Sequence, residues 1–148
     1  MGKIEAINIT NISEENTFYV NQAILEKGKG IVNDRYYENF KEKKEQVTLI
    51  NLEDIDNFNK QIKQNIDAKD FRRNIIVSGI ILNELINNKI KINEITLKIH
   101  EICQPCKYLQ NRLKIPGLVK MLVNKSGVRA EILSSGNLSV GDKIKILK

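Results

Sequence analysis

Two cysteines three residues apart, Cys103 and Cys106, carry the strongest chemical signal in this chain of 148 residues. In a reducing compartment such a pair indicates metal binding, redox exchange or a reactive thiol rather than a disulfide framework. Pro105 suits the first turn of a helix, because its missing N–H would have no partner there. Cys106 would then lie in that first turn, where the partial positive charge of the helix end stabilises a thiolate, with Lys107 as a nearby cation.

The residues around this pair are compatible with three chemical roles for the cysteines. A closed structural zinc site needs four ligands, and the chain adds only His100 to the two cysteines. A thioredoxin-like dithiol exchange fits the pattern Cys-x-Pro-Cys, but such folds place the pair early in the chain and need a cis-proline, for which only Pro116 is left. The third use is a single nucleophilic or metal-ligating thiolate. Because a Cys-x-x-Cys pair often occurs by chance, the pair alone does not decide among them.

A second candidate site is the run that contains Arg72, Arg73 and Asn74, immediately before a strand-like segment. Two guanidinium groups and an amide at the mouth of a buried strand are costly to bury without anionic partners. They suit a phosphate, a carboxylate or the edge of a pterin ring. The alternative is a pair of surface arginines that face water or bridge to Asp67 or Asp70.

A third candidate is the glycine-spaced segment 28–35. Its spacing is not that of a phosphate-binding P-loop, because no Gly-Lys-Ser/Thr follows. We expect a turn in which Asn33 adopts a positive φ and Asp34 bonds back to the backbone. Lys29 and Arg35 are weaker candidates for an anion contact.

Short strand-like segments must position these residues. Alternation is clearest at residues 95–99, where Ile95, Leu97 and Ile99 share one side. Two segments, 90–95 and 138–144, look like hairpins, since in each a polar pair tolerant of positive φ separates apolar strands. Further strands are expected at residues 3–9, 18–25, 46–50 and 74–78.

Helical patterns are fewer. Ile55, Phe58 and Ile62 share one face of a helix that Asn51 could cap. Two further helices are expected at residues 105–113 and 117–123. Many short strands with few helices predict a mainly-β barrel or sandwich, formed by a single domain over residues 1–148.

The composition narrows the ligand class. The net charge is +6, from 24 basic and 18 acidic residues, but the charges are mixed along the chain. With only four Tyr, four Phe and no Trp to stack on bases, a nucleic-acid partner is not expected. Neither a membrane-spanning stretch nor a signal peptide is expected, so we predict a cytoplasmic protein. A small anionic ligand suits this charge balance.

Taken in order, these segments resemble the MOSC domain, the C-terminal module of molybdenum cofactor sulfurases. Each motif alone is weak, but their order and gaps are specific, and the likeness covers nearly the whole chain. The matching stretches are residues 30–35, 46–50 with Glu53, 71–80, 82–85, 103–106, 126–130 and 136–142.

The resemblance implies a MOSC-type β-barrel with a few short helices, and it implies that Cys106 is the functional cysteine. In such domains this thiol is proposed to carry sulfur as a persulfide or to ligate molybdenum directly. Arg72 and Asn74 match polar residues beside the cofactor, with Arg73 between them. Asp34 and Arg35 match a Gly-Asp-Arg element, in which Asn33 stands here in place of the usual glycine.

The resemblance also implies partners. The expected cofactor is the molybdenum cofactor (molybdopterin), and no pyridoxal-phosphate site is expected, so sulfur would come from a cysteine desulfurase or from molybdenum cofactor biosynthesis proteins. A second subunit in a homo-oligomer, or a partner protein, would complete the pocket. Rival hypotheses are a dithiol oxidoreductase that uses both cysteines and a non-enzymatic domain that senses molybdate or the cofactor. Whether the chain is an enzyme stays open.

Overall fold

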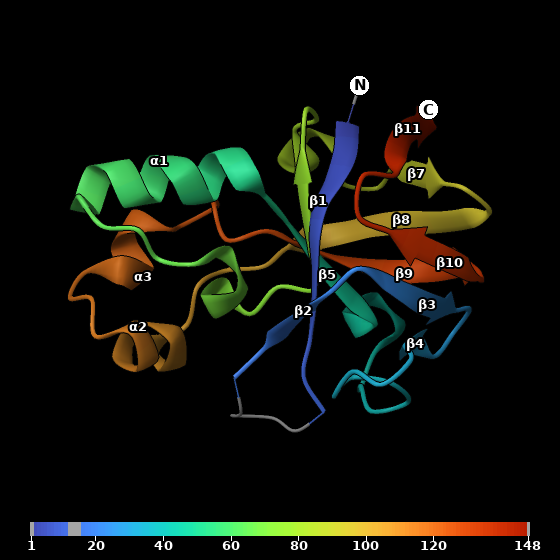
Figure 1. Ribbon diagram of the computed structural model, residues 1–148, viewed down its shortest axis with the longest axis horizontal. Coiled ribbons are helices and arrows are strands. Elements are labelled where there is room, and N and C mark those ends of the chain that lie inside the picture. Colours follow the sequence, from blue (N-terminus) through green and yellow to red (C-terminus); the bar gives the residue numbers. More distant parts are fainter. Residues whose placement is uncertain (1, 12–15, 148) are drawn as a thin grey trace.

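Seven strands close into a barrel in the computed structural model, which describes residues 2–11 and 16–147 (Figure 1). Neighbouring strands are antiparallel except β5 and β6, which are parallel. The barrel closes where β1 pairs with β11, through Gly2 opposite Ile144 and Lys3 opposite Lys143. In the order of the barrel, the strands are β1 (Gly2–Ile9), β6 (Ile75–Ser78), β5 (Val47–Asn51), β9 (Val128–Ser134), β8 (Ile95–Ile102), β7 (Lys89–Ile92) and β11 (Lys143–Leu147).

Four shorter strands lie outside the ring. β2 (Phe18–Val20) extends the large sheet beside β1. The other three, β3 (Gln22–Glu26), β4 (Gly30–Ile31) and β10 (Gly136–Ser139), form a separate sheet. The expected strand 18–25 is therefore two strands, β2 and β3, which belong to different sheets.

The two expected hairpins have different outcomes. The segment 90–95 does join β7 to β8, with Asn93 at a φ of 55°. The hairpin at 138–144 is wrong: β10 pairs with β3, while β11 pairs with β7 and β1. Gly141, at a φ of 94°, makes a turn there that carries the chain from one sheet to the other. The predicted turn is present at Gly141, but a turn alone does not determine which strands pair.

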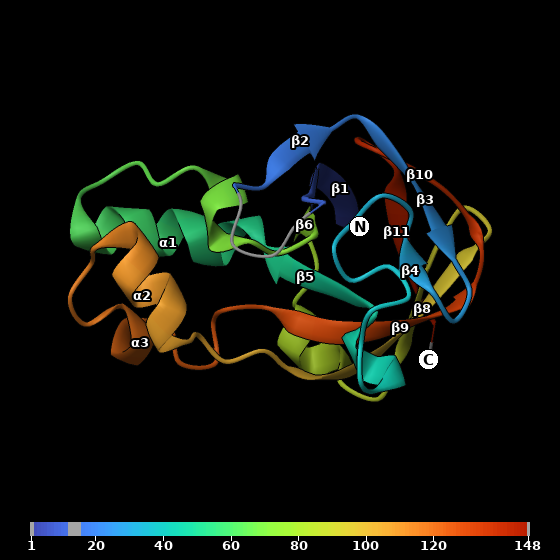
Figure 2. The same cartoon turned by 90° about the horizontal axis from the view of Figure 1, so that it is seen from below.

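Three α-helices gather beside one end of the barrel (Figures 1 and 2): α1 (Leu52–Ile62), α2 (Lys107–Leu113) and α3 (Leu118–Met121). Single 3-10 turns occur at η1 (Lys43–Glu45), η2 (Ala68–Phe71) and η3 (Leu82–Leu85). Asn51 is the N-cap of α1, but its side chain does not cap the helix; it donates to the Ile80 carbonyl (2.6 Å) and accepts from the Leu82 N–H (3.2 Å). Within the described ranges, no helix is long and apolar enough to cross a membrane.

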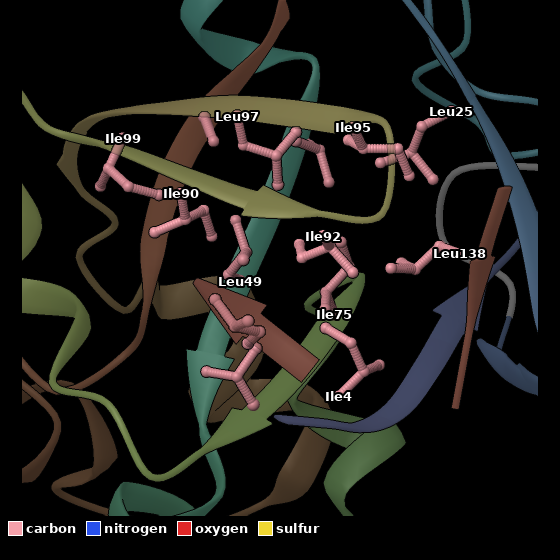
Figure 3. Close-up of a cluster of buried hydrophobic side chains, with 14 of the residues drawn as sticks. Ile4, Leu25, Leu49, Ile75, Ile90, Ile92, Ile95, Leu97, Ile99 and Leu138 are labelled. Carbon is pink, nitrogen blue, oxygen red and sulfur yellow. The ribbon is translucent and has the colours of Figure 1, made fainter. Parts of the chain in front are cut away.

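Two apolar cores lie on opposite sides of β5 and β6. The larger core fills the barrel and is built mostly from Ile and Leu side chains (Figure 3). The smaller core lies between the helices and the outer face of these two strands, and contains an edge-to-face pair of Phe58 and Phe71 with ring centroids 5.8 Å apart. All five residues of β5 are buried, with Leu49 in the first core and Ile50 in the second. The strand therefore separates the barrel from the helical layer.

Candidate functional site

Two adjoining cavities lie between the helical layer and the rim of the barrel. Both are lined by Arg35, Tyr36, Arg72 and Arg73. We call the first, of about 210 Å³, the outer compartment; its other lining residues are Phe71, Cys106, Tyr108 and Leu109. We call the second, of about 170 Å³, the inner compartment; its other lining residues are Glu45, Thr48, Cys103 and Arg129.

Cys106 is solvent-exposed and lies in the wall of the outer compartment. The expectation that Pro105 starts a helix is wrong, because α2 begins at Lys107 and Cys106 is its N-cap with an extended backbone (φ −118°, ψ 162°). The reason is the anchor at Gln104, whose amide exchanges hydrogen bonds with Asn124 (2.6 and 2.9 Å). These bonds hold the segment before the helix in an extended conformation.

Cys103 lies at the other end of the same segment and is buried. Its backbone N–H donates to the Gly127 carbonyl (2.8 Å), which fixes it beside β9. Burial raises the pKa of the Cys103 thiol, and the neighbouring Arg73 and Arg129 only partly oppose that shift. Both cysteines are free thiols, and they face different compartments.

Arg72 is held in an unusual backbone conformation. It ends η2 in the left-handed region, with a φ of 63°, and it is only 8% exposed. Burial, together with the positive charges of Arg35 and Arg112, lowers the pKa of its guanidinium. Its guanidinium lies 5.9 Å from the ring centre of Tyr108. Such strain in a residue other than glycine persists only where the surroundings enforce it, and it is enriched at functional sites.

Arg35 and Arg73 are fixed by neighbouring groups. Arg35 lies over the ring of Tyr36, with its guanidinium carbon 4.7 Å from the ring centre. Arg73 donates through Nε to the Ser126 carbonyl (2.7 Å) and through Nη2 to Ser126 Oγ (3.0 Å). These contacts keep both guanidinium groups in the walls of the two compartments.

Asp34 and Asn74, both expected to bind cofactor, are buried beside the site but do not line either compartment. Asp34 accepts from the N–H of Thr10 (3.1 Å) and that of Tyr36 (3.4 Å). Burial raises the pKa of Asp34, and the bond from Thr10 opposes this. Asn74 accepts from the Thr48 N–H (3.1 Å) through Oδ1. Their contacts order the segments that carry Arg35, Arg72 and Arg73.

Two other expectations concern the loop before Arg35. Asn33 has the predicted positive φ, at 74°, and Asp34 bonds back to the backbone as expected. Lys29 is exposed and lines neither compartment. The structure thus brings Cys106, Arg72, Arg73 and Arg35 together, and leaves Lys29 outside.

A zinc site finds no support. Across residues 2–11 and 16–147, no group of three or more His, Cys, Asp or Glu side chains could hold a metal ion. His100, the expected third ligand, instead pairs with Glu131, with Nε2 2.9 Å from a carboxylate oxygen. A single soft thiolate ligand would not require such a cluster.

Sequence reasoning missed several lining residues, among them Tyr36, Tyr108, Thr48 and Arg129. The last two are opposite one another on β5 and β9. A signal was present, because Thr48 follows the buried Val47 and Arg129 alternates with the buried Val128 and Ala130. That alternation indicates the outer face of a strand but does not say which cavity the face borders.

A family model described as the MOSC domain matches residues 36–145. The chain belongs to the MOSC domain family. The match includes both cysteines and the arginine pair, whereas Asp34 and Arg35 precede it. The family and the mainly-β barrel predicted from the sequence are thereby confirmed. The MOSC domain is linked to molybdenum cofactor sulfurases and related proteins.

Solved structures support the same fold. The YUAD protein of Bacillus subtilis is 18% identical, with a TM-score of 0.83 over 99% of this chain and 96% of that one. YiiM of Geobacillus stearothermophilus is 16% identical, with a TM-score of 0.81 over 100% of this chain and 76% of that one. YiiM of Escherichia coli is 12% identical, with a TM-score of 0.75 over 99% and 70%. No curated protein sequence matches the chain.

Proposed function

We propose that this MOSC domain handles the molybdenum cofactor, and that the Cys106 thiolate either ligates molybdenum or carries sulfur for the cofactor. The observation that carries this proposal is the outer compartment itself. It presents an accessible thiol in a wall that also contains three guanidinium groups, those of Arg35, Arg72 and Arg73.

The lining of the outer compartment fits an anionic ligand with a planar ring system. Among the described residues, no Asp or Glu lines this compartment, so the three arginines give it a positive potential. Phe71, Leu109 and the rings of Tyr36 and Tyr108 supply apolar and aromatic surface. Pterin phosphates combine a flat ring with a dianion, which suits guanidinium groups beside aromatic side chains.

The residues divide into those that would touch the cofactor and those that would position them. Cys106 would supply a soft ligand, of the kind that transition metals accept from thiolates. Arg72 and Arg73 would hold the phosphate, with Arg35 as a further donor. Asn74 and Asp34 would act as positioning residues, since their side chains bond within the protein. When bound, the cofactor would supply the redox or oxo-transfer chemistry.

Sulfur carriage would use the same thiol. The Cys106 thiolate would attack the outer sulfur of a persulfide on a donor protein such as a cysteine desulfurase. A new S–S bond forms on Cys106, the donor's S–S bond breaks, and the donor leaves as its thiolate. An exposed thiol at the mouth of a cavity can be reached by such a partner, whereas the buried Cys103 cannot. Molybdenum cofactor biosynthesis proteins in the cytoplasm, or a second copy of the chain, would be the other partners.

The test is to load the purified protein with molybdenum cofactor and to measure retained molybdenum by mass spectrometry. The same protein is incubated with a cysteine desulfurase and cysteine, and its intact mass is examined for an added sulfur atom. We expect at least one of the two signals, and we expect Cys106→Ser to abolish it.

The matched control is Cys103→Ala, which removes the neighbouring thiol and should leave the signal in place. Retention of the wild-type signal by Cys106→Ser would overturn the role of Cys106. An equal loss in both variants, together with a reversible disulfide in the wild type, would favour the dithiol oxidoreductase instead. Cofactor retention without sulfur uptake would favour ligation or sensing over sulfur transfer.

A further inference from the structure

The inner compartment has features that the proposed handling of a cofactor at Cys106 does not use. Four of its lining side chains are arginines, and Glu45 is the carboxylate among its lining residues within the described chain. That carboxylate already accepts from the Lys41 N–H (3.2 Å). Four arginines and one carboxylate give the compartment a lining with net positive charge.

Strand register gives Arg129, which lines this compartment, a polar neighbour on each adjacent strand. Arg129 lies opposite Thr48 on β5 and opposite Glu101 on β8. The register of β8 shifts between Ile99 and Glu101, and this irregularity brings Glu101 into line with Arg129. Thr48, Arg129 and Glu101 therefore form a polar row across three neighbouring strands of the barrel.

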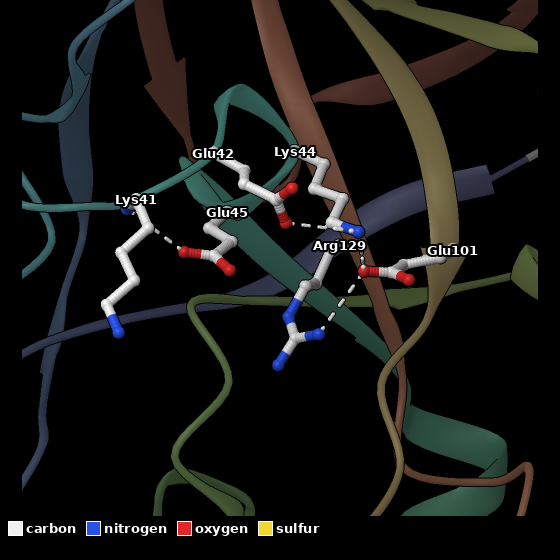
Figure 4. Close-up of polar contacts among 6 residues, drawn as sticks. All are labelled: Lys41, Glu42, Lys44, Glu45, Glu101 and Arg129. Atoms are coloured by element: carbon white, nitrogen blue, oxygen red, sulfur yellow. Dashed lines mark hydrogen bonds and ion pairs between the residues drawn. The ribbon is translucent and has the colours of Figure 1, made fainter.

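Ion pairs hold the Arg129 side chain in place (Figure 4). Arg129 Nη1 lies 3.3 Å from a Glu101 oxygen, and Lys44 Nζ lies 3.1 Å from the same oxygen. Lys44 also pairs with Glu42 at 3.2 Å, which ties the segment around η1 to the row. A guanidinium group has five N–H donors, so a contact through Nη1 leaves it able to bind an anion as well.

The size and chemistry of the compartment select a small ligand. Its volume of about 170 Å³ leaves room for a small anion. The Thr48 hydroxyl donates to Asn74 Oδ1 (3.2 Å) and accepts from the Asn74 N–H (2.9 Å), so it fixes the wall of the compartment. Arg73 is oriented by its bonds to Ser126. Because burial raises the pKa of Cys103, that thiol stays neutral and adds no competing negative charge.

We propose that the inner compartment binds a tetrahedral oxyanion, with Arg129 and Arg73 as its principal donors. The oxyanion is either a free inorganic ion or the phosphate group of a phosphomonoester. This site adjoins the outer compartment and shares Arg73 with it, but it does not include the Cys106 thiol, and its test does not depend on the proposed cofactor chemistry.

Isothermal titration calorimetry with inorganic phosphate, and in a second arm with glycerol phosphate, tests the proposal at low ionic strength. We expect Arg129→Gln to weaken phosphate binding by about tenfold or more, since a charge-assisted contact is lost. The matched control is Lys91→Gln on β7, an exposed residue on another strand, which makes the same charge change and should weaken binding less than about twofold. Arg129→Lys keeps the cation and should lie between the two, which guards against a folding defect.

The alkylation rate of Cys103, which lines the inner compartment, shows whether phosphate binds there. In a Cys106→Ser background, phosphate should slow the alkylation of Cys103 by iodoacetamide, and Arg129→Gln should remove that protection. Binding of inorganic phosphate alone identifies a free ion, while binding of both probes identifies a phosphomonoester group; each supports the site. Equal affinities in Arg129→Gln and Lys91→Gln, or no detectable phosphate binding, would overturn it. Because the readout uses Cys106→Ser, failure of the cofactor proposal leaves this result unaffected.

Discussion

The outer and inner compartments share four lining residues but are built from different kinds of structure. The outer compartment takes Cys106, Tyr108 and Leu109 from a short helix and the segment before it. The inner compartment takes Thr48 and Arg129 from paired strands of the barrel. Loops and short helices vary more readily than a closed sheet. Our two proposals therefore assign the cofactor to the wall built from loop and helix, and the oxyanion to the wall built from paired strands.

The two thiols show the same contrast. Cys106 is exposed at the mouth of its compartment, and Cys103 is buried behind two arginines. The two cysteines of the Cys-x-x-Cys pair are therefore not equivalent, because the two sulfur atoms differ in access and in surroundings. Substitutions and thiol chemistry can test that asymmetry, and the largest effect is expected from a change at Gly127.

Gly127 follows Ser126, which holds Arg73, and its carbonyl accepts from the Cys103 N–H, so Gly127→Ala should have the largest effect. A Cβ there would lie 2.2 Å from the Leu49 carbonyl oxygen, at a φ of +97°. We expect a loss of about 3 kcal/mol in the free energy of unfolding, measured by urea denaturation. Gly28→Ala is the control, because its φ is +72° but no atom lies within 4 Å, and it should cost about 1 kcal/mol. Equal losses would contradict the close approach at Gly127.

Thiol reactivity should separate the two cysteines next. We expect Cys106, read in Cys103→Ala, to react with iodoacetamide on the order of 100-fold faster at pH 7 than Cys103, read in Cys106→Ser, because buried thiols are inert. Since the pKa of Cys103 is raised, its thiolate fraction is low at neutral pH and its rate should keep rising at pH values where an ordinary thiol has levelled off. Similar rates and similar pH profiles would remove the asymmetry between the compartments.

Substitutions at Arg72 should change stability less, but the sign of the stability difference between two variants is diagnostic. Because its φ is 63°, Arg72→Gly should be more stable than Arg72→Ala by about 1 kcal/mol, although glycine is the more flexible residue. At Arg73, whose φ is not positive, the order should reverse. Both pairs are compared by thermal unfolding. An Ala variant that is the more stable at position 72 would show that the left-handed conformation relaxes.

The smallest expected change is in the ion pairs of Figure 4. Lys44→Gln should lower the Tm by about 1 °C or less, since exposed ion pairs contribute little. The bond from Lys44 lowers the pKa of Glu101, so this stabilisation is present at pH 7 and is lost as the pH falls through that lowered pKa. The variant and the wild type should therefore converge in acid. A difference that persists in acid would assign the effect to packing.

Much of the barrel could be predicted from the sequence because its strands carry their own signal. The alternation of Ile95, Leu97 and Ile99 is a local property that follows directly from the pleat of a strand. The pairing of β10 with β3, 110 or more residues apart in the chain, is not local, and a turn motif at Gly141 could not reveal it.

The candidate site was predicted in part for the same reason. Cys106, Arg72 and Arg73 stood out by residue type and spacing, and the resemblance to the MOSC family linked them. Arg129 did not stand out, because its place depends on a register shift in β8 and on the pairing of β9 with β5. The start of α2 was misplaced because the contact between Gln104 and Asn124 spans 20 residues.

The closure of the barrel between β1 and β11 has a consequence for the order of folding. The pairs Gly2–Ile144 and Lys3–Lys143 join segments from opposite ends of the described chain, so they close the longest loop in the molecule and are entropically the most costly to form. We therefore expect the ring to close late, and refolding to take milliseconds to seconds, as in other folds dominated by distant pairings. Until that step, β1 and β11 each present an open strand edge to other chains.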